Sequence, residues 1–277
     1  MFNIDKLRRN SKLVSCLSLA AGIVLSLQPL GAQVGLGLSP MRTELRLAPG
    51  AAYTGTLRLV NEGAPVRTRT TLLDFHLDAE QTPQFEDQLP EEALYSCRTW
   101  LSANPMESEI NANGQVVVRY TIRVPSDAQP RSYNCAAGFT SLPPVSAVNG
   151  FGIRTAVRVV AAFYVIVGNP TVLGTLSQIA MEHVPGSADM RAVVVLENSG
   201  KMFYRPTGSL TVLDPGGQIL ETYDITPIPV LPERKQRLVF PLKKVADGQP
   251  CTLRVRVDVG TGEILEGSAV VQSSPAQ

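Results

Sequence analysis

The chain has 277 residues, of which 44% are apolar and 18% charged, with 22 glycines and 21 prolines. A formal net charge of +1 gives it no overall attraction to nucleic acid or to an anionic bilayer. So many turn formers, spread between short β-branched runs, exclude a mainly helical protein and favour an all-β one. The length allows one large core or two of ordinary size.

The first 32 residues have the composition of a secretory signal. A basic head is followed by an apolar run at 13–27, and Leu30-Gly31-Ala32 offers small residues to a signal peptidase. A membrane anchor would need about 20 apolar residues, and this run is shorter. We expect residues 1–32 to be cleaved, which removes four basic residues and one acidic one and leaves a formal charge of −2. The mature protein is then periplasmic or secreted, with no membrane span.

Alternating and β-branched runs predict seven strands in the first half of the chain. The first is broken at Pro40, as an edge strand tolerates. The predicted strands cover residues 36–47, 54–60, 66–77, 98–103, 115–124, 132–141 and 153–167, with a long polar connection at 78–92. Short strands separated by polar turns are typical of an immunoglobulin-like sandwich, with a closed barrel as the alternative.

The strand pattern restarts after Gly168-Asn169-Pro170. Residues 192–200 repeat the form of 57–63, in which an apolar strand runs into an Asn-containing turn that ends in Gly. Further strands are predicted at 209–213, 218–222, 237–242 and 252–259. The fold class is therefore all-β, with two tandem immunoglobulin-like β-sandwich domains at 33–169 and 170–272 and a frayed tail at 273–277.

Three cysteines remain after cleavage of the signal. Cys97 and Cys135 lie on neighbouring predicted strands of one domain, so we expect them to form a disulfide in an oxidising compartment. Cys251 is then left as a small buried apolar residue. The spacing of the cysteines resembles no metal site, and no cofactor is expected.

The titratable residues do not predict an enzyme. His76 lies inside a predicted strand and His183 beside a turn, and neither has a neighbouring nucleophile or a metal-spaced partner. The paired acids Glu91/Glu92 and Glu107/Glu109 are expected in solvated polar loops. No glycine-rich loop follows a strand and opens a helix to hold a phosphate. We therefore expect no catalytic site.

The predicted strand 153–167 changes character along its length. Its first half has one apolar face and one that carries Arg154 and Arg158, whereas its second half is apolar on both faces. This indicates that the strand begins at a half-solvated edge and continues into a more buried environment, such as a cleft between the domains. Either it is simply the last strand of its sandwich, or its edge is open to pair with another chain.

The signal, the tandem sandwiches and the long apolar strand together resemble the periplasmic pilus chaperones of the PapD type and, more closely, their looser chaperone-like relatives. The resemblance covers 36–170 best, and the segments that carry it are Leu38-Ser-Pro-Met-Arg42, Thr56-Leu-Arg-Leu-Val-Asn61 and 104–114. It implies that the last strand of the first domain completes the sandwich of an exported, pilin-like subunit. In that family an arginine and a lysine hold the subunit's terminal carboxylate, and an outer-membrane usher is a further partner. Arg42 matches the arginine, but Ala161 stands in the place of the lysine, and Arg158 lies on the opposite face.

On this resemblance we expect a non-enzymatic, chaperone-like protein that binds an exported subunit by strand addition, in the assembly of a pilus or another surface structure. The alternative is a structural or adhesive envelope protein that uses the same domains as spacers and has no client. The residues expected to bind the partner are Arg42, Ile153, Thr155, Val157, Arg158, Val159, Ala161 and Phe163.

Overall fold

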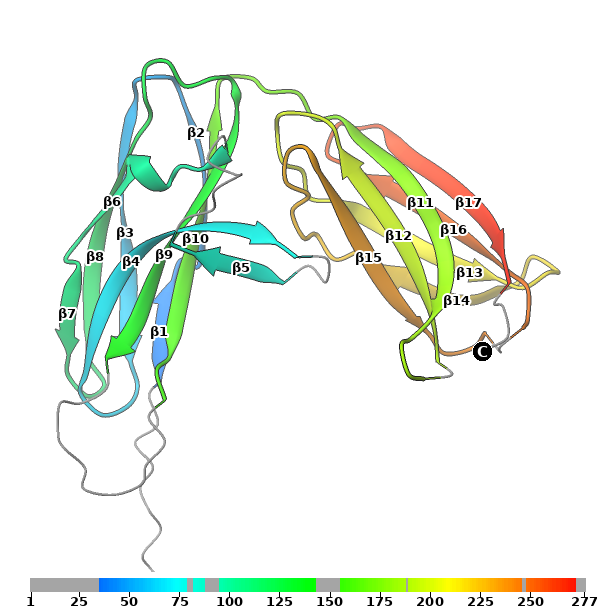
Figure 1. Ribbon diagram of the computed structural model, residues 1–277, viewed down its shortest axis with the longest axis horizontal. Helices are drawn as coiled ribbons and strands as arrows, with labels where there is room; N and C mark the ends of the chain where they lie inside the picture. The colour runs from blue at the N-terminus through cyan, green and yellow to red at the C-terminus, as the bar shows by residue number, and fades with distance from the viewer. Residues whose placement is uncertain are drawn as a thin grey trace, which may run out of the picture. The chain divides into compact units, whose positions relative to one another are not determined.

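The computed structural model describes residues 35–78, 82–87, 95–142, 155–187, 189–245 and 248–272, and most of them lie in strands (Figure 1). The predicted signal at 1–32, the tail at 273–277 and Ile153 lie outside the described residues. In the part of the chain that is described, no helix has the length and hydropathy needed to cross a membrane.

The strands from Leu36 to Val167 form two sheets. One sheet has the order β1-β3-β8-β6, and the other has the order β2-β10-β9-β4-β5, with β7 also paired to β4. The strands are β1 (Leu36–Ser39), β2 (Arg42–Leu47), β3 (Ala52–Asn61), β4 (Val66–Leu77), β5 (Pro83–Glu86), β6 (Leu101–Asn104), β7 (Glu107–Ile110), β8 (Gln115–Arg123), β9 (Arg131–Leu142) and β10 (Arg158–Val167).

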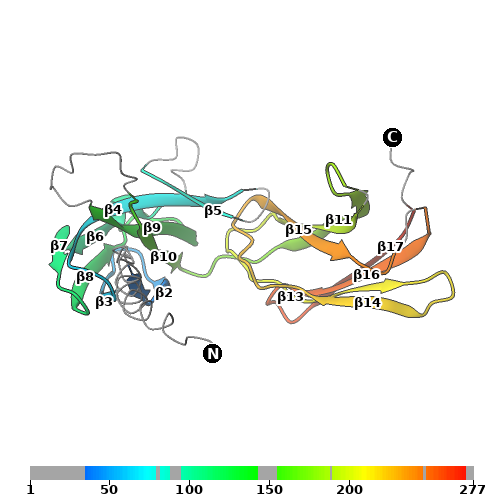
Figure 2. The same cartoon turned by 90° about the horizontal axis from the view of Figure 1, so that it is seen from below.

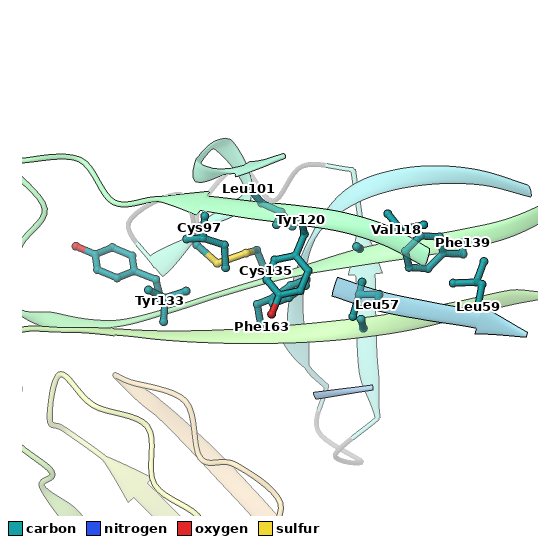
Figure 3. Packing of buried hydrophobic residues seen from close by; sticks show 14 of the residues in the cluster. Leu57, Leu59, Cys97, Leu101, Val118, Tyr120, Tyr133, Cys135, Phe139 and Phe163 are labelled. Carbon is teal, nitrogen blue, oxygen red and sulfur yellow. A yellow bond between two sulfur atoms is a disulfide. The ribbon is translucent and has the colours of Figure 1, made fainter. Parts of the chain in front are cut away.

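Alternation of apolar and polar residues places these strands on a shared core. In β3 the side chains of Leu57 and Leu59 are fully buried while those of Thr56 and Arg58 are exposed. In β8 Val118, Tyr120 and Ile122 alternate in the same way. Figure 3 shows the labelled members of this set, Leu57, Leu59, Val118 and Tyr120, packed with side chains of β9 and β10. The first sandwich therefore has the single apolar core that the sequence pattern predicts.

The chain changes sheets at Pro40. Before it, β1 pairs antiparallel with β3, and after it β2 pairs parallel with β10. Pro40 has no N–H to donate to either ladder, which suits a crossing point between the sheets. The predicted break in the first strand is confirmed. The strand predicted at 98–103 is wrong in its first half, because Arg98–Trp100 form a 3-10 turn (η2) before β6.

The strands from Gly174 to Val271 form a second pair of sheets, with the orders β11-β12-β15 and β14-β13-β16-β17. The two sheets face each other across a second core (Figure 2). The strands are β11 (Gly174–His183), β12 (Met190–Asn198), β13 (Thr207–Leu213), β14 (Ile219–Asp224), β15 (Arg234–Leu242), β16 (Cys251–Asp258) and β17 (Ile264–Val271). The predicted class of two immunoglobulin-like sandwiches is confirmed, and the expected boundary at 169–170 falls between β10 and β11. The sequence reading missed β5, β7, β11 and β17.

A third apolar cluster lies on the outer face of the sheet that contains β10. Residues Val34–Gln277 form one compact unit, and in it Tyr164 and Ile166 of β10 pack with Phe203 and Leu231 from the second half of the chain. The rings of Tyr164 and Phe203 lie 4.8 Å apart between centroids. The second half of the predicted strand is apolar on both faces because each face packs on a different cluster.

Candidate functional site

The last strand of the first sandwich is paired on both sides for only part of its length. Along one side β9 pairs with all of β10, from Arg158 to Val167. Along the other side β2 pairs only with Ala162–Val167, in parallel, beginning at Arg42. In the described part of the chain no strand pairs with this second side of β10 before Ala162. An edge of four strand residues is therefore left open.

The ladder pattern identifies the main-chain groups on the open side. Ser141 donates its N–H to the Val157 carbonyl at 2.8 Å, so the main chain of Val157 points toward β9. Because direction alternates along a strand, Val159 and Ala161 also point toward β9, whereas Arg158 and Val160 point away from it. Ala162, two residues after Val160, donates its N–H to the Met41 carbonyl at 2.9 Å, on the side away from β9. This bond confirms that the even-numbered residues of β10 point away from β9. Arg158 and Val160 thus present two N–H and two C=O groups to the open side.

Partly buried apolar side chains line this edge. Val159 packs on the first core from β10, and Leu36 and Leu38 pack on it from the neighbouring β1. On the outer face Val160 packs on the third cluster and Arg158 is exposed. Thr155, which precedes the strand, is exposed as well. The edge therefore combines unpaired main chain with apolar surface that a further strand could cover.

The other half of the predicted edge is closed. Phe163 is fully buried, pairs with Thr43 and Cys135 on its two sides, and its ring centroid lies 4.7 Å from that of Tyr120 (Figure 3). Ala161 is 1% exposed, with its side chain in the core. The hypothesis of an edge free along its whole length is therefore wrong for Ala162–Val167, because β2 already occupies that side. Phe163 is a core residue with no free main chain.

Arg42 lies where the open edge ends. Its side chain is 59% exposed, and its Nε lies 3.6 Å from Oε1 of Glu44. That oxygen also accepts bonds from Nε and Nη2 of Arg205, at 3.1 and 3.0 Å. The Arg205 guanidinium lies 5.0 Å from the ring centroid of Tyr164, whose pKa is raised by burial. Glu44 is thus bound mainly by Arg205, which leaves the Arg42 guanidinium largely available.

Arg158 does not take the place of the lysine that the resemblance calls for. Its Nε donates to Oγ1 of Thr140 at 3.1 Å, on the exposed outer face of the sheet. Ala161 points into the core instead. Of the two cationic groups expected near the edge, β2 and β10 therefore provide Arg42 alone.

The predicted disulfide is present between Cys97 and Cys135, with 5.2 Å between the Cα atoms. Both cysteines are fully buried in the first core, beside Tyr133 and Phe163 (Figure 3). Cys97 lies just before η2 rather than on a strand, which corrects its predicted placement. Cys135 pairs with Phe163 in the sheet, so the bridge joins the segment before η2 to the strand beside β10. Cys251 is a buried free thiol, as expected.

Other candidate chemistry forms no site among the described residues. No group of three or more His, Cys, Asp or Glu side chains there could hold a metal ion. His76 lies in β4 and His183 at the end of β11, far apart in the topology. Glu107 and Glu109 are exposed, as expected, but the prediction of a loop is wrong, because both lie in β7, where Glu107 bonds Arg69 at 2.9 Å.

The sequence reading missed the groups that hold the edge in place. Ser141 Oγ accepts the N–H of Val157 at 2.8 Å, and Glu44 and Arg205 form the ion pair beside Arg42. The break at Pro40 could have predicted that the edge of β10 is only partly open. Because the first strand divides there between two sheets, only its second part, β2, covers β10. Nothing in the sequence connects Arg205 with Glu44.

Fold and site together define a protein of two immunoglobulin-like sandwiches whose first domain ends in a partly open strand. The solved structures that the chain is similar to include fimbrial chaperones. A chain from the structure described as the chaperone–tip adhesin complex of CFA/I fimbriae biogenesis is 9% identical, with a TM-score of 0.47, and the match covers 87% of this chain and 100% of that one. The class 5 fimbriae chaperone CfaA is 9% identical with a TM-score of 0.44, and the match covers 87% of this chain and 100% of that one. The YadV chaperone is 14% identical with a TM-score of 0.43, and the match covers 85% of this chain and 98% of that one.

No protein-family model and no curated protein sequence matches the chain. The likeness to fimbrial chaperones is one of fold alone, so any function has to be argued from the chain's own residues.

Proposed function

We propose that this protein is a chaperone-like binding protein that takes up an extended segment of an exported protein subunit by β-strand addition along residues 155–161. The observation that carries the proposal is the unpaired main chain of Arg158 and Val160 beside partly buried apolar side chains. The proposal includes no catalytic step and no cofactor. Its setting is the periplasm or the exterior of the cell, where a disulfide forms and persists.

The energetics suit a reversible complex. Each main-chain hydrogen bond contributes about 0.5–1.5 kcal/mol net, and the open edge offers up to four. Each apolar side chain that the added strand buries against the core contributes about 1.5–3 kcal/mol. These gains are reduced by the entropy lost when a flexible segment is ordered. Neither the main-chain bonds nor the apolar contacts alone would give a stable complex, but both together would.

We infer the direction of the added strand from the strand that it would extend. β2 runs parallel to β10 and begins at Arg42, opposite Ala162. A client strand laid parallel to β10 along 155–161 lies in line with β2 and ends at its first residue. We therefore place the C-terminal carboxylate of the client strand beside the Arg42 guanidinium, which can donate two parallel bonds to it.

The test uses a seven-residue peptide of alternating valine and threonine, made once with a free C-terminal carboxylate and once as the amide. We expect wild-type protein to bind the free acid about tenfold more tightly than the amide, since a hydrogen bond to a charged group is worth more than a neutral one. Arg42→Ala should abolish that difference. Arg46→Ala is the matched control, because Arg46 is exposed on the same strand, beside the closed half of β10.

Equal binding of acid and amide by wild-type protein would remove the role of Arg42 and leave strand addition standing. Failure to bind either peptide at millimolar concentration would contradict strand addition, as a spacer protein without a client predicts.

A further inference from the structure

The outer face of the sheet β1-β3-β8-β6 carries charge of one sign only. Arg58 of β3 and Arg119 and Arg123 of β8 are exposed on it. The four strands contain no Asp, Glu, Lys or His. The remaining outward side chains in the centre of the face are mostly hydroxyl and amide groups, among them Thr54, Thr56, Ser102 and Asn104.

The register brings the arginines together. Arg58 pairs with Val117 and Arg119 pairs with Thr56, so the two arginines are diagonal neighbours with Cα atoms about 7–8 Å apart. Arg123 lies four residues further along β8, about 13 Å from Arg119. Between them Thr54 and Thr121 share a hydrogen bond of 2.9 Å. The result is a cationic strip in which the main chain of β3 and β8 is already bonded in ladders.

None of the ion pairs between described residues involves these three arginines, although other exposed arginines of the chain are paired. In the first sandwich Arg69 bonds Glu107 at 2.9 Å. On the four-stranded sheet of the second sandwich, Arg256 of β16 lies 3.6 Å from Glu266 of β17. Like charges on neighbouring strands of one face repel each other. The three arginines therefore add no stabilising ion pair to the fold, and their arrangement favours an anionic partner.

We propose that this strip docks an acidic polypeptide segment, at a site separate from the open edge of β10. Arginine forms paired bonds with carboxylates, and the intervening hydroxyl and amide groups can bond a partner's main chain. An anionic bilayer fits less well because Val117 is the one large apolar side chain exposed at the centre of the face, and surface binding to lipid needs several apolar anchors.

The experiment measures binding of a fluorescent octaglutamate peptide at low salt. In the double variant Arg58→Gln with Arg119→Gln we expect about fivefold to tenfold weaker binding and a weaker salt dependence. The control is Arg254→Gln with Arg256→Gln, which removes two exposed arginines from the sheet of the second sandwich and should change affinity less than about twofold. Thermal unfolding of the first double variant should occur no lower than that of the control, because relieving the repulsion costs the fold nothing.

Three results would overturn the proposal. Equal weakening in both double variants would show an effect of net charge alone. Unchanged binding in the Arg58/Arg119 variant would show that the strip is not the site. Binding of phosphatidylglycerol vesicles or of an oligothymidylate that depends on Arg58 and Arg119, without binding of octaglutamate, would assign the strip to a lipid surface or a nucleic acid.

Discussion

Val160→Pro tests whether the main-chain N–H of Val160, on the open edge of β10, binds an added strand. The N–H of Val160 points away from β9, so replacing it with proline removes a donor on the open side and leaves the β9 ladder bonds of Val159 and Ala161 in place. Proline is tolerated at such edge positions. Val160→Ala is the matched control, because it shortens the same side chain and keeps the N–H.

The expected loss can be worked from the two donors at the edge. Removing one of them costs the complex about 0.5–1.5 kcal/mol, and the proline ring also occupies the space where the added strand would lie. The alternating peptide should therefore bind to Val160→Pro at least about tenfold more weakly than to Val160→Ala.

Affinity is measured by titration calorimetry, and unfolding by guanidinium is measured on the same samples. The stabilities of the proline and alanine variants should agree within about 1 kcal/mol, since no native hydrogen bond is lost. Equal affinities for the two variants would refute strand addition at this edge. A proline variant that unfolds much more readily than the alanine variant would show that the Val160 N–H is already bonded in the free protein.

Three further outcomes are expected. Val157→Asp combined with Val159→Asp places two carboxylates on the apolar side of the open edge and should abolish peptide binding in the same titration; binding at wild-type affinity would exclude these residues from the site. Replacing Cys97 and Cys135 by alanine opens a link across 38 positions of sequence and should lower the free energy of unfolding by about 4 kcal/mol in guanidinium, whereas a loss under about 1 kcal/mol would mean that the bridge constrains little. The pKa of Glu182 is held below its ordinary value of 4.5, chiefly by a bond from Arg237, so its stabilising contribution is complete above pH 4.5 and fades as the pH falls through the lower folded-state pKa. Glu182→Gln should accordingly reduce stability at neutral pH and approach wild type in acid, and a difference that does not depend on pH would contradict this.

Much of the fold followed from local pattern. The bounds of β3, in which Leu57 and Leu59 alternate with exposed residues, were predicted to within two residues. The disulfide was predicted because Cys97 and Cys135 lie in one predicted domain of a chain that was expected to be exported. Pro40 marked the break in the first strand, because a residue without an N–H cannot continue a ladder.

The remainder depends on groups that meet only in three dimensions. The pairing of β2 with β10 closes half of the predicted edge, and it joins residues more than a hundred positions apart in the chain. Glu44 and Arg205 are separated still further. The short strands β5 and β7 are rich in polar residues, so alternation could not reveal them; their pairing with β4 determines them instead.

Hydrogen exchange at single residues tests the open edge most directly. In the free protein the amides of Arg158 and Val160 should exchange rapidly while those of Val159 and Ala161, bonded to β9, exchange slowly. Saturation with the alternating peptide should protect Arg158 and Val160. Protection of both amides before any peptide is added, or rapid exchange that persists in the saturated complex, would contradict the account.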